Sequence, residues 1–128
     1  MEAHDIRAVL ASLPPPQEVT TAEEDAAAFP KLAAFGSGGV YVGRFAGDSS
    51  PWEFHPDADE LLHVLDGELE VTVLTADGSK QVAVKAGCFF VVPEGHWHHV
   101  SARPTATLLA VSPRTEVSFE DPRSRRRE

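Results

Sequence analysis

The stretch WEFHPDADELLHVLDGELEVTVL, residues 52–74, decides the fold class. It contains three short β-rich runs divided by a proline and by an Asp-Gly pair, which is a common hairpin turn. In the run ELEVTVL, apolar residues alternate strictly with polar ones, so one face of that strand is apolar. The stretch therefore predicts consecutive strands at 52–55, 60–65 and 68–74, with a hairpin turn at Asp66-Gly67.

Similar β-rich runs continue on both sides of this stretch, with turn residues between them. They are GVYVGRF at 39–45, QVAVK at 81–85, CFFVV at 88–92, HHVSA at 98–102 and TATLLAV at 105–111. The breaks fall at Asp77-Gly78, at Pro93–Gly95 and at Arg103-Pro104. Roughly eight short strands without helices between them predict an all-β sandwich, jelly roll or small barrel.

Helical signals are confined to the beginning of the chain. Asp5 is a suitable N-cap, and the three prolines at 14–16 end the helix that follows it. A second, weakly amphipathic helix is expected at 21–28, where acidic residues lie in the first turn. The first helix is expected to pack on the barrel through its apolar residues, Ile6, Val9, Leu10 and Leu13. We thus predict an N-terminal helical extension at 1–35, a barrel at 36–113 and a C-terminal extension at 114–128 with a mobile Arg-rich tail.

The charge of the chain argues against binding to nucleic acid. The formal net charge is −9, and four of the 11 basic residues lie in the last six positions, so the rest of the chain is more acidic still. Such a body repels phosphate backbones. The apolar runs are too short to span a bilayer, so no membrane association is expected.

The N-terminus lacks the apolar core of a signal peptide, and a single cysteine, Cys88, excludes an intrachain disulfide. Both points favour a cytoplasmic location. We expect Cys88 to be a small buried core residue rather than a reactive thiol.

A carboxylate at residue 60 breaks the apolar pattern of its strand. Glu60 has the same parity as Leu62 and Val64, which places it on the face that points to the interior. Burying such a charge alone is very unfavourable, and a metal ion with neighbouring imidazoles would neutralise it. Glu53 and His55 point to one face of the preceding strand and can supply further ligands.

These residues fall into a pattern that resembles the two motifs of the cupin family. The first motif corresponds to Gly47, Glu53-Phe54-His55, Glu60 and Gly67, and the second to Gly87, Pro93, Gly95 and His98. The resemblance spans about residues 36 to 113. It implies a single jelly-roll barrel with a short N-terminal helix.

The resemblance also implies a metal site. His55, Glu60 and His98 match family ligands, whereas Glu53 replaces the usual first histidine. Two carboxylates and two imidazoles favour a divalent ion such as Mn, Fe, Zn or Ni. Alternatively, Glu53 pairs with a cation such as Arg44, or metal binding has been lost.

Three further histidines lie close to these motifs. His96 shares the parity of His98 but lies in a turn, where it is the best candidate for a catalytic acid or base, with an exposed loop histidine as the alternative. His63 is expected on the outer sheet face. His99 alternates away from His98 and is expected to be structural.

Two functions stay open at this level. The first is a metalloenzyme of dioxygenase, isomerase or decarboxylase type that acts on a small polar organic acid or sugar derivative, as the resemblance implies. The second is a non-catalytic metal-binding, ligand-binding or sensor domain. An open mouth with converging polar groups favours the enzyme, and a shell closed by Trp97 or phenylalanine side chains favours the binding domain.

A homodimer is expected to form through the outer sheet faces. If Glu53, His55 and Glu60 face inward, the alternate positions in the same strands face outward. One short helix cannot cover all of their large apolar side chains, and cupins are commonly dimeric. The outward positions are Trp52, Phe54, Leu61 and Leu65.

Overall fold

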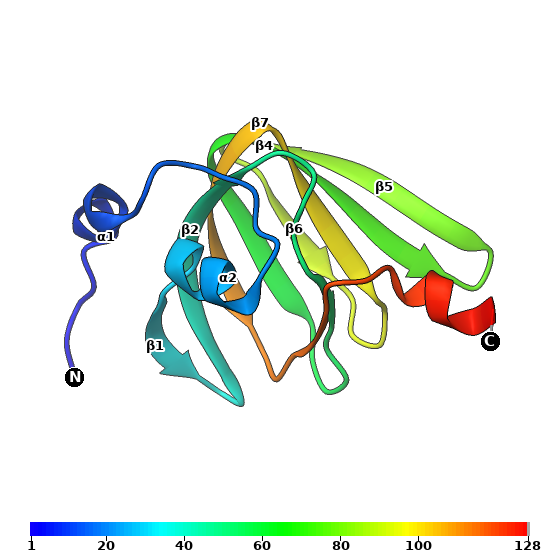
Figure 1. Cartoon of the computed structure of the whole chain (residues 1–128). Coiled ribbons are helices and arrows are strands. Elements are labelled where there is room, and N and C mark those ends of the chain that lie inside the picture. Colours follow the sequence, from blue (N-terminus) through cyan, green and yellow to red (C-terminus); the bar gives the residue numbers. More distant parts are fainter. Residues whose placement is uncertain (128) are drawn as a thin grey trace.

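A computed structural model describes residues 1–127, with no description of the side chains of residues 125–127. Its central feature is a curled antiparallel sheet of eight strands within that range (Figure 1). The strands are β1 (Lys31–Phe35), β2 (Gly38–Ala46), β3 (Trp52–Phe54), β4 (Glu60–Thr75), β5 (Gly78–Lys85), β6 (Phe89–Val92), β7 (His98–Ser112) and β8 (Glu116–Ser118). The predicted all-β, jelly-roll class is confirmed.

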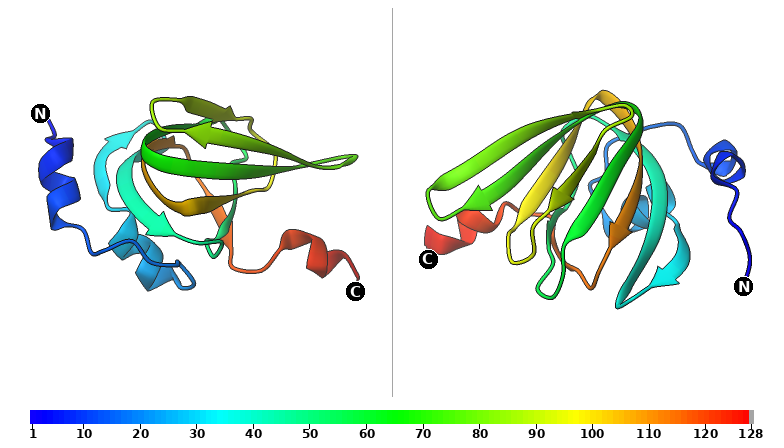
Figure 2. Two further views of the ribbon diagram at one scale, coloured as in Figure 1. Left: turned by 90° about the horizontal axis from the view of Figure 1, so that it is seen from above. Right: turned by 180° about the vertical axis from the view of Figure 1, so that it is seen from behind.

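Three short helices flank the sheet at the two ends of the chain. They are α1 (Ile6–Ser12), α2 (Ala22–Ala28) and the 3-10 helix η1 (Pro122–Arg127). The two termini lie on opposite sides of the curled sheet (Figure 2). None of the helices in the described residues is long and apolar enough to cross a bilayer.

The long strand β4 corrects the predicted hairpin at Asp66-Gly67. β4 runs through this pair without turning, and its pairing with β7 shifts register on either side of it. The pair is therefore a bulge in a continuous strand. Gly67 has a φ of 76°, a left-handed conformation that side chains other than glycine rarely adopt.

The bulge changes which residues of β4 face the interior. Before it the even-numbered residues are buried, and after it the odd-numbered ones are. One strand can therefore line the core at both of its ends, although a strict alternation would expose one half. The buried side chains are Glu60, Leu62 and Val64 before the bulge, and Leu69, Val71 and Val73 after it.

The predicted break at Arg103-Pro104 is also wrong, because β7 continues through this cis peptide bond. Hydrogen bonds from the loop after β2 bridge this part of the strand. The amide of Gly47 donates to the Pro104 carbonyl at 3.1 Å, and the amide of Ala102 donates to the Gly47 carbonyl at 2.8 Å. β7 consequently pairs with β2 and with nearly the whole of β4.

The two N-terminal helices form where the sequence predicts them. Asp5 caps α1 by accepting from the amide of Ala8, and Thr21 and Glu24 form a capping box on α2. The apolar residues predicted to pack α1 on the barrel, Ile6, Val9, Leu10 and Leu13, are half-buried, and none is fully buried. Arg44 of β2 donates to the carbonyls of Leu13 and Pro14, which ties the end of α1 to the sheet.

The sheet begins earlier and ends later than the predicted limits of 36 and 113. β1 precedes residue 36 and pairs with β2, and β8 follows residue 113 and pairs with β3. Part of the predicted C-terminal extension is thus a strand of the sheet. The structure does not describe the side chains of residues 125–127, and it does not describe residue 128. The predicted mobility of the Arg-rich tail therefore falls outside the described residues.

The C-terminal segment also corrects the expected position of Trp52. This side chain is buried, because His99 lies against it at a ring distance of 5.0 Å and the Arg123 guanidinium lies 5.5 Å from its centroid. Trp52 therefore does not contribute to the exposed apolar surface that was expected to form the dimer interface.

Cys88 was expected in the core but is exposed. It lies in the turn between β5 and β6 rather than in a strand, and alternation therefore does not direct its side chain inward. The exposed apolar residues of this region are instead Phe89 and Val91 on β6, which are 65% and 42% exposed to solvent.

The bulge yields a prediction about stability. A Cβ atom at Gly67 would collide with the carbonyl oxygen of Thr105, whereas one at Gly87, which has a similar φ of 87°, would meet open space. Gly87→Ala should lower the free energy of unfolding by about 1–2 kcal/mol, because alanine must adopt the left-handed backbone conformation there. Gly67→Ala should cost roughly 2 kcal/mol more, because the strands must also separate. Urea unfolding of both variants measures the difference, and equal losses would show that β4 and β7 do not approach closely at the bulge.

Candidate metal centre

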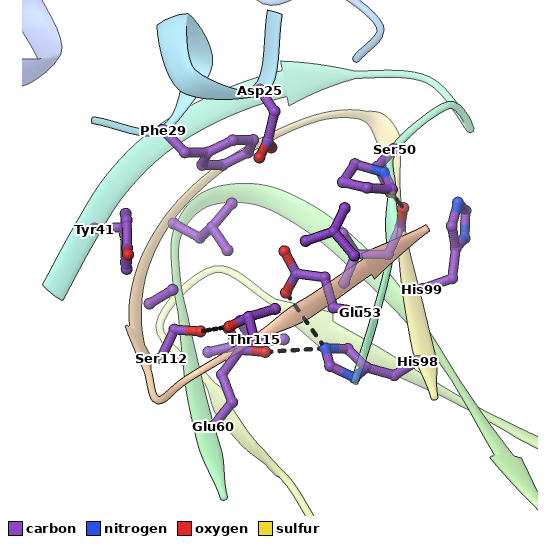
Figure 3. A pocket seen from close by; sticks show the side chains of 16 residues that line it. Asp25, Phe29, Tyr41, Ser50, Glu53, Glu60, His98, His99, Ser112 and Thr115 are labelled. Atoms are coloured by element: carbon purple, nitrogen blue, oxygen red, sulfur yellow. Dashed lines mark hydrogen bonds and ion pairs between the residues drawn. The ribbon is translucent and has the colours of Figure 1, made fainter. Parts of the chain in front are cut away.

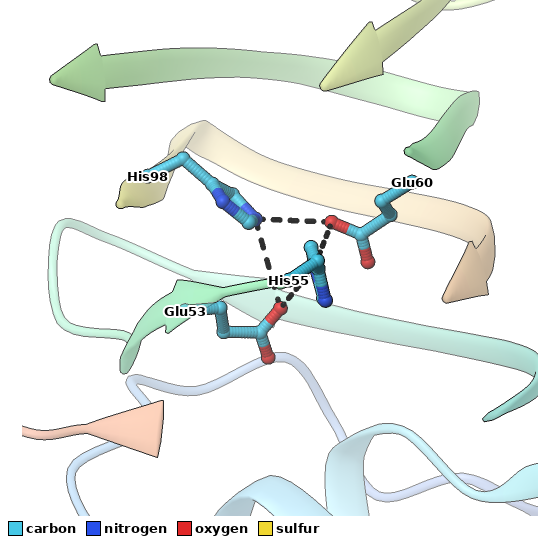
Figure 4. Close-up of side chains that lie close together, drawn as sticks. All are labelled: Glu53, His55, Glu60 and His98. Carbon is cyan, nitrogen blue, oxygen red and sulfur yellow. Dashed lines mark hydrogen bonds and ion pairs between the residues drawn. The ribbon is translucent and has the colours of Figure 1, made fainter. Parts of the chain in front are cut away.

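Four side chains from three parts of the sheet meet at one point inside the curled sheet (Figure 4). Glu53 belongs to β3 and His55 follows that strand, while Glu60 begins β4 and His98 begins β7. β3 pairs with β7 through Glu53 and His98, which brings those two side chains together. The structure therefore unites all four predicted ligands, with one ligand atom of each within 4.8 Å of the others.

The distances between these atoms suit a shared metal ion. The Nε2 atoms of His55 and His98 lie 3.1 and 3.0 Å from Oε1 of Glu60, and each lies 3.7 Å from Oε1 of Glu53. Two ligand atoms that each lie about 2.1 Å from one ion are roughly 3.0–3.4 Å apart in octahedral or tetrahedral geometry. The distances from Glu60 to His55 and to His98 already fall in this range, and those from Glu53 to the two rings lie slightly outside it.

On the far side of each ring, the Nδ1 atom lies near an oxygen that can accept a hydrogen bond from it. The Thr115 hydroxyl donates to the Pro113 carbonyl at 2.8 Å, so its oxygen accepts from Nδ1 of His55 at 3.1 Å. Nδ1 of His98 lies 3.5 Å from the His96 carbonyl, which can only accept. A ring that donates from Nδ1 can offer Nε2 to a metal ion, and both Nε2 atoms lie beside the same Glu60 oxygen.

The charges of this site are strongly perturbed by burial. Burial alone raises the pKa of Glu60, but hydrogen bonds and charge interactions with His55 and His98 outweigh it and lower the pKa to about 2. The pKa of Glu53 is raised well above its usual range by burial first, and then by the negative charges of Glu60 and Asp25. Glu60 therefore stays ionised while only 3% exposed, a state that calls for positive charge beside it.

The alternative pairing of Glu53 with Arg44 is wrong. The Arg44 guanidinium donates to two backbone carbonyls near the end of α1. Within the residues that the structure describes, the ion pairs of Glu53 are with the two histidines of the site. The donor set of two carboxylates and two imidazoles fits a divalent ion.

A cavity of about 210 Å³ borders the cluster (Figure 3). Glu53, Glu60 and His98 form part of its wall, so a small molecule in the cavity would reach the ligand atoms directly. The remaining wall is mostly apolar, with the hydroxyl-bearing residues Tyr41, Ser50, Ser112 and Thr115 among its lining residues. The side chain of Trp97 does not close this space, since it packs on Phe54 beside a separate depression.

The other histidines lie outside the ligand cluster. The His96 side chain lines that separate depression, and its Nδ1 lies 2.9 Å from the Leu74 carbonyl. The contact of His96 with the site is through its backbone carbonyl, near His98, so a catalytic role for its side chain stays a prediction. His63 is half-buried on the opposite face of β4 from Glu60, as expected. His99 packs on Trp52 but also lines the cavity, where burial lowers its pKa.

Two side chains that matter to the site come from segments that the motifs do not cover. Thr115 holds His55 in orientation, and Asp25 of α2 lines the cavity. The alternation of apolar residues carries no signal for either, because one lies in a turn before a short strand and the other in a short acidic helix.

Comparison with known proteins agrees with the observed fold. The family profile described as the cupin domain matches residues 45–112, more than half of the chain. The chain therefore belongs to the cupin family. No curated protein matches it.

Solved structures share the fold at low sequence identity. The protein NMB1881 from Neisseria meningitidis is 18% identical with a TM-score of 0.66, over 88% of this chain and 100% of that one. A cupin-2 domain containing protein from Shewanella frigidimarina is 23% identical with a TM-score of 0.55, over 67% and 79%. Hydroxypropylphosphonic acid epoxidase from S. wedmorenis, solved with fosfomycin, is 20% identical with a TM-score of 0.50, over 70% of this chain and 46% of the epoxidase chain.

The hydrogen bond from His55 to Thr115 generates a prediction about metal affinity. Thr115→Val keeps the shape of the side chain but removes the oxygen that fixes the ring, so metal affinity should fall by about 10- to 100-fold. Thr107→Val, at a half-buried position of β7 on the opposite face from the cavity, is the matched control and should leave the affinity unchanged. Competition with a chromogenic chelator measures both; unchanged affinity in Thr115→Val would remove the orienting role of this residue.

Proposed function

We propose that this cupin is a divalent-metal-dependent enzyme that acts on a small molecule bound beside the metal. The observation that carries the proposal is the cavity, whose wall includes three of the four candidate ligands. A purely structural site would be closed by its own ligands and by surrounding side chains. Here the ligand atoms face a space several times larger than the roughly 30 Å³ of one water molecule in the liquid.

His55, Glu60 and His98 would hold the ion, and Glu53 would complete the set. A divalent ion in this position would supply Lewis-acid chemistry to a bound substrate. The residues of the chain do the remaining work: Thr115 orients His55, and the apolar wall offers a contact surface to a bound molecule. Reactions of the dioxygenase, isomerase or decarboxylase type are the classes that this arrangement supports.

The metal content of purified protein tests this proposal. Protein purified without chelator should contain about one divalent Mn, Fe, Zn or Ni ion per chain by elemental analysis. His98→Ala should lose most of it, because the ion loses an imidazole ligand. Glu53→Gln should retain the ion with reduced affinity, since its carboxylate lies farther from the imidazoles than that of Glu60 does.

The matched control is His63→Ala, which removes a histidine from the opposite face of the same sheet. It should keep the wild-type metal content. Equal content in His98→Ala and His63→Ala would overturn the metal site. If the protein binds the metal but converts no compound in a broad substrate screen, the proposed enzymatic activity is overturned and the chain is a metal-binding domain.

We also propose a homodimer, formed by a different surface from the one that contains Trp52. The outer face of β6 exposes Phe89 and Val91, and Val91 and Leu61 are direct partners in the sheet. Among the described strands β6 pairs with β4 alone, so its other edge has free backbone groups. A second copy that presents the same edge across a two-fold axis would cover both the edge and the two apolar side chains.

Light scattering at micromolar concentration tests the dimer. The wild type should have about twice the chain mass of 13.8 kDa. Phe89→Glu should give the monomer mass, because it places a charge in the interface, whereas Phe35→Glu, which alters an equally exposed phenylalanine on β1, should remain dimeric. A monomeric wild type would refute the dimer, and a dimeric Phe89→Glu would move the interface elsewhere.

A further inference from the structure

Asp25 is a carboxylate at the cavity that the metal cluster does not use. It lies on α2, and its side chain lines the same cavity as Glu53 and Glu60. Figure 3 shows the Asp25 carboxylate beside the Phe29 ring, directed into the space above Glu53. The cavity thus has a group of ligand atoms on one side and a separate acid on the other.

The neighbours of Asp25 leave its charge uncompensated. Within the described residues its side chain has neither a hydrogen bond nor an ion pair, and its negative charge is repelled by that of Glu53. Burial raises the pKa of Asp25, which shows that the surroundings disfavour its charged form. The same helix provides a contrast in Glu24, which is half-buried like Asp25 but whose pKa is lowered, mainly by hydrogen bonds from Thr20.

In the described part of the chain, no lysine or arginine is among the residues that line the cavity. A divalent ion would balance the two carboxylates of Glu53 and Glu60. Asp25 then remains as a single negative charge in a largely apolar space.

Resting on the proposed function, we infer that the cavity takes a small primary amine, whose ammonium group pairs with Asp25 while the rest of the molecule lies against the apolar wall near the metal. An ammonium group supplies the positive charge and the hydrogen-bond donors that Asp25 lacks. Phe29, Leu62 and Leu108 offer an apolar surface for a compact hydrocarbon body. A carboxylate ligand with no amine would instead meet an uncompensated negative charge.

A simpler role for Asp25 is to stabilise the N-terminus of α2 through its negative charge. Glu23 occupies the same first turn, carries the same charge and is exposed. Replacing Glu23 therefore reproduces the loss of helix stabilisation without touching the cavity. Any effect of Asp25 that Glu23 does not share belongs to the cavity.

The test uses three probes of one shape and different charge: benzylamine, benzyl alcohol and benzoate. Dissociation constants are measured by NMR titration at pH 7 on the full chain, once after treatment with EDTA and once loaded with Zn²⁺. The proteins are the wild type, Asp25→Asn, Asp25→Ser and the control Glu23→Gln. Thermal unfolding of each variant confirms that it is folded.

In the wild type, benzylamine should bind more tightly than the other two probes. Asp25→Asn and Asp25→Ser should weaken the binding of benzylamine at least tenfold and the binding of benzyl alcohol less than twofold, because a charged pair is lost only with the amine. Glu23→Gln should change neither. Benzoate binding as tightly as benzylamine to the EDTA-treated protein, or an equal effect of the Asp25 and Glu23 variants on benzylamine binding, would overturn the inference.

The two metal states separate this inference from the proposed function. A chain that fails to bind Zn²⁺ but still loses benzylamine when Asp25 is replaced overturns the metal site and supports the amine site. A chain that binds Zn²⁺ and is indifferent to the replacement of Asp25 overturns the amine site alone.

Discussion

The contact of one buried carboxylate with two imidazoles governs the architecture of this protein. Glu60 is ionised in the interior, and His55 and His98 direct Nε2 atoms to the same oxygen at 3.1 and 3.0 Å. An arrangement of this kind is unfavourable unless positive charge lies between the groups. The rest of the fold makes the contact possible: β3, β4 and β7 converge at one end of the curled sheet, and the bulge at Gly67 keeps both halves of β4 facing the core.

Much of this arrangement follows from the sequence because alternation and spacing are local properties. The parity of Glu60, Leu62 and Val64 correctly places the carboxylate in the interior. The Asp-Gly pair at 66–67 is different, because a hairpin and a bulge both change the parity of the buried residues. Only the pairing of β4 with β7 on both sides of the pair distinguishes them.

Other features could not be predicted because they depend on contacts between distant segments. Trp52 alternates outward from Glu53, yet His99 and the C-terminal segment cover it. Thr115 and Asp25 come from the two ends of the chain and meet the central motif only in the folded protein. The central strands thus supply the candidate ligands, while the flanking segments orient one ligand and form part of the cavity.

The metal site is best tested by a crystal structure of protein purified without chelator, with anomalous data at the absorption edge of the metal. We expect one ion bonded to Nε2 of His55, Nε2 of His98 and a carboxylate oxygen of Glu60, at about 2.0–2.2 Å for a zinc-like ion. Soaking the crystals in a divalent salt should restore the ion if purification removes it. A site that stays free of metal after soaking, with both imidazoles still in contact with Glu60, would contradict it, since protons on the rings would then stabilise the carboxylate.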